Sequence, residues 1–598
     1  MKKKYGLILI TFAVGSVIGA PYFANAATME NLSPGGVTQT LYQAGKFQDC
    51  EHTYELQNDS YEATEIAGGY RHYICSNCSE EYAYETDPLI YETEGTANEG
   101  ATNPYLPLWE HMPDGDPHVF WSKEDGEWRV YIYGTHDVDP GIDKYGKVED
   151  EAPNFCSDHY ITWSAPVYDL SEWRYEGTLY TLDASVTEFR KTAASDCNYN
   201  LQNDKYYFAV CRPMAGTTLL EGNKPNDSFE KAVYFNEFFD PSVYIEDGTI
   251  YLVSCSGIDK LRSATEEDDM EYELTLDQHF ALTDSETGES LPYLYEASSM
   301  RYIEEYDLYV YIWSSKVTED ETEHSTMSYA YSQNIESESW IYGGVFSDSS
   351  GRYTLDLATN EIKKGEPTYS YGNNHGGIVN VNGQWYYFGH RDSGATEYRR
   401  QGWIEKINMS YENGKFVIEP HELTSSGAAD YLDAYQNIPA GIVCYLTPAL
   451  NMEKNKDQLT QFVDVTMEES AVHETPVVGL ENGSVAGFKY LNFAEEAQLL
   501  KLNMLFTQEE GYVDGRVAIY LDGPDEETGT LVASIDITKE NLSSGVKESG
   551  SDGTEWTWLS TETSAKISGV HAVYFVFSSD EEGTICKFDE FSFEKIAD

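Results

Sequence analysis

Short runs of aromatic and β-branched residues alternate with polar residues over most of the chain, and runs of 10–15 residues with helical period are almost absent. One strand type recurs five times, each time after a turn of acidic, Asn or Gly residues. The five runs are Arg129–Tyr133, Lys205–Ala209, Thr249–Val253, Leu308–Ile312 and Gln384–Phe388. A second β-type run precedes each turn, so the repeating unit contains a hairpin. Five four-stranded units, spaced by roughly 45–80 residues, predict an all-β, five-bladed β-propeller. A β-sandwich with strands of similar length is the alternative.

Period-two strands return in the last part of the chain. They are Ala497–Met504, Arg516–Asp522, Thr530–Asp536 and Ala572–Phe577. This pattern predicts a β-sandwich (jelly-roll-like) module over 458–598. A linker at Met452–Lys456 would separate it from a propeller domain over 101–450.

The first 26 residues have the pattern of an export signal. Three lysines at positions 2–4 precede an apolar stretch, Tyr5–Ala20, and a small-x-small site ends at Ala26. An uncleaved membrane anchor is the alternative, but the apolar stretch is short for a bilayer span. We therefore expect a secreted, extracellular protein with no membrane contact after cleavage.

A cluster of metal-type ligands follows within 27–100. Cys50, His52, Cys75 and Cys78 supply the four ligands of a closed tetrahedral zinc site, and a disulfide within the set is the alternative. In either case the module is expected to be structural. The other six cysteines stand singly among apolar neighbours, as buried thiols do.

Charge excludes several functions. The 598 residues carry 103 Asp and Glu against 38 Lys and Arg, a formal net charge of −65. Such a polyanion repels phosphate backbones and anionic lipid, so nucleic-acid and membrane-surface partners are not expected. Aromatic residues make up 14% of the chain, which is enough apolar surface to drive folding despite the charge. The acidic residues are therefore expected to lie on a solvated surface.

An ionisable residue opens the first strand of every repeat. The five openers are Asp116, Asp196, Asp240, Glu296 and His375. In a propeller the first strands line the central channel, so these groups are expected to converge at its mouth. Neighbouring buried carboxylates cannot all ionise, and the resulting division into an acid and a base is what glycoside hydrolysis requires. No organic cofactor is expected.

The motifs around these openers resemble glycoside hydrolase family 43, in the order of that family. They are Asn103-Pro-Tyr-Leu-Pro107, Gly115-Asp-Pro-His-Val-Phe120, Tyr131–Asp137, Phe239-Asp-Pro-Ser-Val-Tyr244, Tyr295–Tyr302, Asn374–Val379, Phe388–Arg391 and Arg400–Gly402. The resemblance covers roughly 103–420. It implies a five-bladed propeller that hydrolyses with inversion and releases arabinofuranose or xylose from plant cell-wall polysaccharide.

The resemblance also implies residue roles. Asp116 would be the general base, Glu296 the general acid and Asp240 the residue that tunes the pKa of the acid. Asp114 lies two residues before Asp116 and is the alternative base. Ala297 stands where the family has Gly, which affects the shape of the substrate site more than the chemistry.

Three further residues are assigned to substrate binding by this resemblance: Asp196, Arg301 and His375. His375 also matches a histidine that in many members helps to hold a water-coordinated calcium ion. Asp196 lies in Ala-Ser-Asp, where the family has Ala-Pro-Asp.

The C-terminal part resembles carbohydrate-binding module family 6, more loosely. Tyr490 and Trp558, or Trp556, match the aromatics that bind a sugar between them, and Asp589 is close to a calcium ligand. Aromatic side chains of the core are the alternative interpretation of both Trp residues.

Two classes of function therefore compete. The first is a secreted inverting glycosidase acting on arabinoxylan, arabinan or xylan, and the second is a non-catalytic lectin or adhesin that uses the same propeller. Retention of three catalytic carboxylates favours the enzyme. A catalytic zinc at the Cys/His cluster is disfavoured, because four protein ligands leave no open position on the metal.

Overall fold

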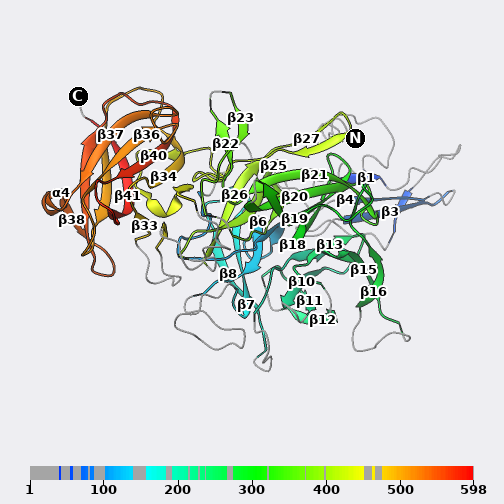
Figure 1. Ribbon diagram of the computed structural model, residues 1–598. Coiled ribbons are helices and arrows are strands. Elements are labelled where there is room, and N and C mark those ends of the chain that lie inside the picture. The colour runs from blue at the N-terminus through cyan, green and yellow to red at the C-terminus, as the bar shows by residue number, and fades with distance from the viewer. Residues whose placement is uncertain are drawn as a thin grey trace.

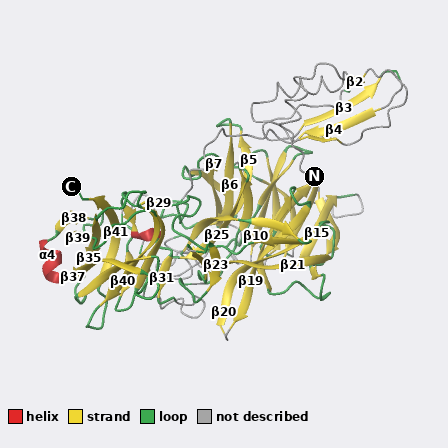
Figure 2. Cartoon of the chain, turned by 90° about the horizontal axis from the view of Figure 1, so that it is seen from above, coloured by secondary structure: helices red, strands yellow, loops and turns green. Residues whose placement is uncertain are grey.

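The computed structural model describes residues 39–41, 54–57, 69–77, 81–86, 102–138, 156–183, 191–212, 216–226, 229–235, 238–265, 274–319, 322–357, 359–370, 372–395, 399–449, 461–464 and 474–596. Nearly all regular structure in these ranges is β (Figures 1 and 2). The exceptions are the one-turn η1 (Ala440–Ile442) and the short α4 (Lys539–Ser544). The prediction of an all-β chain is confirmed.

Five antiparallel sheets follow one another along residues 116–407. The first contains β5 (Asp116–Ser122), β6 (Glu127–Thr135), β7 (His159–Pro166) and β8 (Arg174–Thr181). The second contains β9 (Cys197–Asn200), β10 (Lys205–Arg212), β11 (Gly216–Gly222) and β12 (Glu230–Phe235). The third contains β13 (Ser242–Glu246), β14 (Thr249–Ser254), β15 (Gly257–Ser263) and β16 (Leu274–Phe280).

The fourth sheet has an additional parallel edge strand. It contains β17 (Thr283–Asp284), β18 (Leu294–Ile303), β19 (Leu308–Glu319), β20 (Thr322–Ser332) and β21 (Ser339–Asp348). The fifth contains only β24 (Gly377–Val381), β25 (Gln384–Asp392) and β26 (Arg400–Ile407). Two small hairpins are β22 (Tyr353–Asp356) with β23 (Glu361–Lys364) and β27 (Met409–Glu412) with β28 (Lys415–Ile418). All five predicted hairpins are present, and the repeated runs form their second strands.

The fifth sheet lacks the fourth strand that the repeat predicts among its described residues. The segment before the first sheet lies beside β26 instead: the backbone N–H of Tyr105 donates to the carbonyl of Gly402 at 3.2 Å. The side-chain amide of Asn103 also donates to the carbonyl of Ile404 at 2.8 Å. Residues from the start of the domain thus cover the outer side of its last sheet.

The first strands of the five sheets contact one another in a ring. β5 contacts β9, β9 contacts β13, β13 contacts β18, β18 contacts β24, and β24 contacts β5. Five hydrophobic clusters join successive sheets in the same cyclic order, the last one joining the fifth sheet to the first. Tyr, Trp and Phe side chains contribute to all five clusters and make up most of the one between the first and second sheets, which accounts for part of the aromatic content of the chain.

The N-terminal residues form a sheet of their own. Its order is β1 (Gln39–Leu41), β4 (Glu81–Thr86), β3 (Gly69–Cys75) and β2 (Tyr54–Leu56). Cys75 ends β3 and is buried, while Cys50, His52 and Cys78 lie outside the described residues. Whether zinc or a disulfide joins them stays a prediction.

Two larger sheets form the C-terminal part, at the opposite end of the molecule from the N-terminal sheet (Figure 1). One contains β29 (Leu432–Asp433), β34 (Val485–Asn492), β40 (Val570–Ser578), β36 (Gly515–Leu521), β37 (Thr530–Ile537) and β31 (Tyr445–Thr447). The other contains β32 (Phe462–Val463), β33 (Val477–Leu480), β41 (Cys586–Lys595), β35 (Leu500–Thr507), β39 (Glu555–Glu562), β38 (Val546–Ser549) and β30 (Ile438–Pro439). Both sheets contribute to one hydrophobic core.

The predicted boundary between the two large parts lies too late in the sequence. The chain joins the C-terminal sheets at Leu432, so strands within residues 432–447 belong to these sheets, although Cys444 also contacts Trp403 and Arg391 of the fifth sheet. The strands that make this transition are only two or three residues long and show no periodicity. The predicted linker, 452–456, lies outside the described residues.

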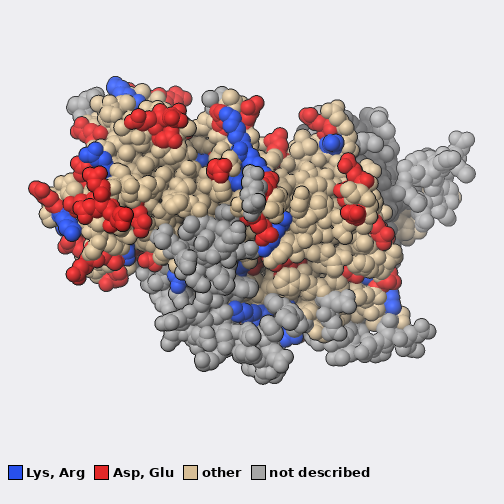
Figure 3. Space-filling model, viewed as in Figure 1, with Lys and Arg blue, Asp and Glu red and all other residues tan. Residues whose placement is uncertain are grey.

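The surface is acidic, as expected. Asp and Glu outnumber Lys and Arg on the face shown in Figure 3, most clearly over the C-terminal sheets. No helix among the described residues has the length and apolar character to span a membrane.

Candidate active site

The ionisable openers lie at the beginnings of the first strands. Asp116 is the first residue of β5, Asp196 immediately precedes β9, Asp240 lies two residues before β13, and Glu296 lies near the start of β18. His375 lies two residues before β24. Since these strands form the ring, the structure brings the five openers to the same end of it.

The carboxyl group of Asp240 lies in a buried, acidic environment to which Glu296 contributes. Asp240 is buried and accepts a hydrogen bond from the backbone N–H of Ala194 at 3.0 Å. Burial, then the charges of Glu296 and Asp114, raise the pKa of Asp240 well above its usual range. Asp240 therefore retains its proton at a pH where ordinary carboxyl groups are ionised.

Asp114 has the opposite environment. Its carboxylate accepts a hydrogen bond from the Thr135 hydroxyl at 2.5 Å and faces Arg400 at 3.4 Å and His390 at 3.5 Å. Burial acts to raise the pKa of Asp114, but Arg400, His390, His375 and Thr135 outweigh it and hold the pKa at about 2. Asp114 is thus ionised at neutral pH, and its charge helps to keep Asp240 protonated.

Arg400 is held by a second carboxylate. It donates to Asp137 at 3.0 Å from Nε and at 2.9 Å from Nη2, and it also contacts the Cys156 sulfur at 3.2 Å. These contacts fix the guanidinium beside Asp114. The motifs contain Asp137 and Arg400, but the sequence analysis gave neither a role, because 263 residues separate the two.

Asp116 lies in a closed environment. Its side chain has 0% exposure, against 8% for Asp114. Arg301 donates to its Oδ1, the Ser299 hydroxyl lies 3.3 Å away, and Gly377 approaches so closely that a Cβ there would lie 2.1 Å from Oδ1. Burial raises the pKa of Asp116 to about 7 against the lowering effect of Arg301.

Asp196 hydrogen-bonds a histidine that the sequence analysis did not single out. His118 Nε2 lies 2.6 Å from Asp196 Oδ1, and the Ser242 hydroxyl donates to Asp196 Oδ2 at 2.7 Å. Burial acts to raise the pKa of Asp196, but His118 outweighs it and the pKa is lowered. His118 lies two residues after Asp116 on the same strand, so period two could have identified it.

The ligand atoms of Asp116, His118 and Asp196 lie within 4.8 Å of one another, as in a metal site. Arg301 Nη2, however, lies 3.4 Å from His118 Nε2 and donates to Asp116. The guanidinium already provides the positive charge, and His118 is bonded to Asp196. This donor set does not fit a cation.

His375 is the remaining opener. It is buried, and its Nε2 has no hydrogen-bond partner among the described residues. Burial lowers its pKa, while the charges of Asp114 and Asp196 act in the opposite direction. A neutral imidazole beside two carboxylates fits either water or a hydrated cation as partner.

Left-handed backbone conformations concentrate at this site. Asp114, Cys156, Asp240 and Ala297 have φ values of 61°, 56°, 46° and 61°. Non-glycine residues rarely adopt such values, and they are typical of functional sites. The Ala297 that departs from the family pattern therefore occupies a position that favours Gly.

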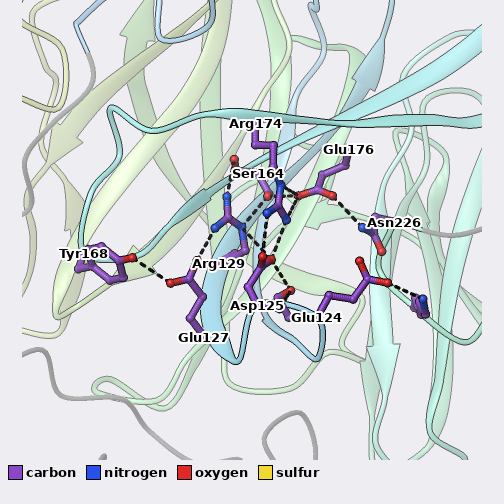
Figure 4. Close-up of polar contacts among 11 residues, drawn as sticks. Glu124, Asp125, Glu127, Arg129, Ser164, Tyr168, Arg174, Glu176 and Asn226 are labelled. Carbon is purple, nitrogen blue, oxygen red and sulfur yellow. Dashed lines mark hydrogen bonds and ion pairs between the residues drawn. The ribbon is translucent and has the colours of Figure 1, made fainter.

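A second group of charged side chains lies at the other end of β5 (Figure 4). Arg174 donates to both carboxylate oxygens of Asp125, at 2.8 and 2.7 Å, and hydrogen bonds from Arg174 hold the pKa of Asp125 below its usual range. Arg174 also donates to Glu176 at 2.9 Å. Because Asp125 and Glu176 are paired with a cation, this cluster is structural.

Two predicted sugar-binding residues of the C-terminal part are buried. Tyr490 is 8% exposed, and its hydroxyl donates to Glu422 at 2.5 Å; Trp556 is 3% exposed. Neither ring has an open face for a sugar, so the structure contradicts this assignment. Trp558 is half-buried and donates to Glu548 at 2.7 Å, so its role stays a prediction.

Asp589 is the predicted calcium ligand of this part. It accepts from the backbone N–H of Thr475 at 2.7 Å, and burial raises its pKa to about 7, with Glu590, Glu474 and Glu548 acting in the same direction. Among the described residues, no three of these carboxyl groups bring their oxygen atoms within 4.8 Å of one another, so the calcium ligand stays a prediction.

The sequence matches no family model. It is 29% identical over 525 residues to a "xylosidase/arabinosidase" of Thermoclostridium stercorarium, a match that covers 81% of this chain and 98% of the relative.

The solved structures that match this chain include glycosidases of family 43. A family 43 arabinoxylan arabinofuranohydrolase of Bacillus subtilis is 18% identical, covering 84% of this chain and 99% of its own, with a TM-score of 0.39. A family 43 β-xylosidase/α-arabinofuranosidase from a compost metagenome is 18% identical, covering 54% and 98%, with a TM-score of 0.37. An exo-β-1,3-galactanase of Phanerochaete chrysosporium is 10% identical, covering 83% and 99%, with a TM-score of 0.40. The chain is therefore similar, over most of its length, to a glycosidase of the xylosidase or arabinofuranosidase type.

Proposed function

We propose that this protein is a secreted glycoside hydrolase that removes arabinofuranosyl or xylosyl residues from xylan or arabinoxylan, with inversion. The observation that carries the proposal is the contrast between Asp240, whose pKa is raised by burial and by the charge of Glu296, and Asp114, which stays ionised. Inverting hydrolysis needs one protonated and one ionised carboxyl group, and environments that give the two groups different pKa values supply them. The similarity to a xylosidase/arabinosidase supports the substrate class.

The fold that we propose is a five-bladed β-propeller followed by a β-sandwich. The ring of first strands and the cyclic order of five hydrophobic clusters support the propeller. The single core shared by two C-terminal sheets supports the sandwich. Secretion rests on the sequence of residues 1–26, which lie outside the described residues.

Glu296 is the general acid in this proposal. It is only half-buried, whereas Asp240 is buried and hydrogen-bonded to backbone, so Glu296 is the member of the pair that can reach a substrate oxygen. The charge of Glu296 acts on Asp240, and by the same interaction Asp240 acts on the proton of Glu296. Asp240 is therefore the positioning and pKa-tuning residue.

Asp114 is the better candidate for the general base. A base must be ionised and must reach a water molecule, and Asp114 has both the lower pKa and the more exposed side chain. Its charge acts on Asp240, whereas Asp116 is coupled to Asp196 and Arg301. The proposal thus prefers the alternative base over Asp116, whose carboxylate holds Arg301 in place.

A calcium ion near His375 remains compatible with the site. Its buried, unpartnered Nε2 and the nearby carboxylates of Asp114 and Asp196 are the groups that would hold a hydrated cation. Such an ion would supply fixed positive charge. In the chain itself, Arg400 already holds Asp114 ionised.

The C-terminal part would bind glycan through Trp558, with a calcium ion at Asp589. The half-buried indole and the acidic surroundings of Asp589 support this assignment. With Tyr490 buried, any sugar site here is smaller than the sequence predicts.

The test is monosaccharide release from arabinoxylan, arabinan and xylan by residues 27–598, beside Glu296→Gln and the exposed control Glu286→Gln. We expect arabinose or xylose from the wild type and the control and none from Glu296→Gln. The anomer first formed, followed by NMR, should be inverted. Binding of these glycans without release by any of the three proteins would instead identify a lectin.

A further inference from the structure

Three exposed aromatic side chains, which we call the aromatic rim, lie close to Asp240 and Glu296 in the sequence. Phe239 precedes Asp240, and Tyr293 and Tyr295 precede Glu296; their exposures are 44%, 52% and 48%. Single exposed aromatics elsewhere on a surface need no explanation. These three, however, all lie in the two short segments that also contain Asp240 and Glu296.

The backbone before β13 turns Phe239 outward. Phe238 packs inward against Phe235, with ring centroids 5.6 Å apart, and has φ 79°. Asp240, on the other side, has φ 46°. Left-handed conformations at bulky residues are costly, and here they direct one ring into the core and the next into solvent.

A β-bulge at the start of β18 turns Tyr295 outward in a similar way. Leu294 pairs with Ser315 and Glu296 with Ser314, so Tyr295 is the additional residue of the bulge. Leu294 packs against the core between the third and fourth sheets. Bulges next to active sites redirect side chains, and this one exposes Tyr295 beside the acid.

Lys316 fixes the orientation of the Tyr295 ring. Its Nζ lies 4.0 Å from the ring centroid and 3.4 Å from a carboxylate oxygen of Glu323, so the ammonium group is held from both sides. A cation–π contact of this kind orients an aromatic ring. Since 48% of Tyr295 is still exposed, much of the ring remains open to a ligand.

We propose that the aromatic rim binds the main-chain sugar rings of the polysaccharide, on the leaving-group side of the bond that is cleaved. This rests on the proposed function and identifies the part of the substrate that these residues hold. A general acid protonates the leaving oxygen, so the leaving chain must extend past Glu296. The apolar faces of pyranose rings pack well on aromatic faces, and an uncharged glycan suits so acidic a protein.

The kinetic test compares Phe239→Ala and Tyr295→Ala with Tyr175→Ala, a control that is 48% exposed on β8. With xylotetraose and arabinoxylan, kcat/KM should fall about tenfold for each rim ring and stay unchanged in the control. Free xylose or arabinose occupies only the site of the released sugar, on the other side of the cleaved bond from the rim. The inhibition constants of these monosaccharides should therefore stay unchanged in the rim variants. Unchanged kcat/KM in both rim variants, or an equal loss of monosaccharide inhibition, would overturn the proposal.

A binding measurement separates this proposal from the proposed function. Calorimetry with xylotetraose uses protein carrying Glu296→Gln and Trp558→Ala, so that neither turnover nor the C-terminal part contributes. Each rim substitution should weaken binding about tenfold, whether or not the wild type releases sugar. Equal binding with and without the rim rings, or no binding by the parent protein, would contradict the aromatic rim as a glycan site.

Discussion

The pH dependence of kcat/KM distinguishes the two candidate bases. The pKa of Asp114 is about 2 and that of Asp116 about 7. At pH 5 Asp114 would therefore be almost fully ionised, whereas about 1% of Asp116 would be, and a reaction that needs ionised Asp116 would slow about tenfold for each pH unit below 7. With Asp114 as the base, the profile should stay flat through this range on its acidic side.

The assay measures kcat/KM from pH 4 to pH 8 for the wild type, Asp114→Asn and Asp116→Asn. Loss of a general base lowers the rate by about 10²–10⁴-fold, and we expect this loss for Asp114→Asn. Asp116→Asn should lower activity less and leave the acidic side of the profile in place, because Arg301 keeps hydrogen bonds to the carbonyls of Pro117 and Ile378. An acidic limb centred near pH 7 that disappears in Asp116→Asn would refute this reasoning.

Three further predictions follow from other contacts. Arg400→Met removes the positive charge that lowers the pKa of Asp114 against the effect of burial. The acidic limb of the kcat/KM profile, measured down to about pH 2, should therefore move up by about one unit or more, equivalent to about 1.4 kcal/mol per unit. A limb that does not move would show that Arg400 does not set the pKa of the base. Lys489→Met leaves the buried carboxylate of Glu422, 2.6 Å away, without its cation, so the folded state should lose about 3–5 kcal/mol by denaturant unfolding. Adding Glu422→Gln should recover part of that loss, and no recovery would show that packing and not charge is responsible. If the N-terminal cluster holds zinc, metal analysis should find about one zinc per chain in the wild type and none in Cys75→Ser, whereas metal-free wild-type protein would favour the disulfide.

The five hairpins were predictable because each carries a local signal. A turn of acidic residues, Asn or Gly precedes an aromatic strand of period two in every repeat, and the structure has a hairpin at each place. The convergence of the openers followed from the same pattern, since equivalent strand starts meet in a cyclic arrangement.

Contacts between distant residues were not predictable in this way. Arg400 lies 286 residues from Asp114, and nothing local at Asp114 indicates that a guanidinium would hold it ionised. Tyr490 matched an exposed aromatic of a sugar-binding module, but Glu422, 68 residues earlier, accepts a hydrogen bond from its hydroxyl in a buried contact. The C-terminal boundary was placed late because β29 and β30 contain two residues each, too few to show a period.

The central claim is that Glu296 donates a proton to the leaving oxygen. Its most direct test compares Glu296→Gln with the wild type on xylo-oligosaccharides, which need that proton, and on a 2,4-dinitrophenyl glycoside, whose leaving group does not. The account predicts a loss of about 10²–10⁴-fold on the oligosaccharides and near wild-type rates on the activated substrate. An equal loss on both substrates, or full activity on both, would contradict it.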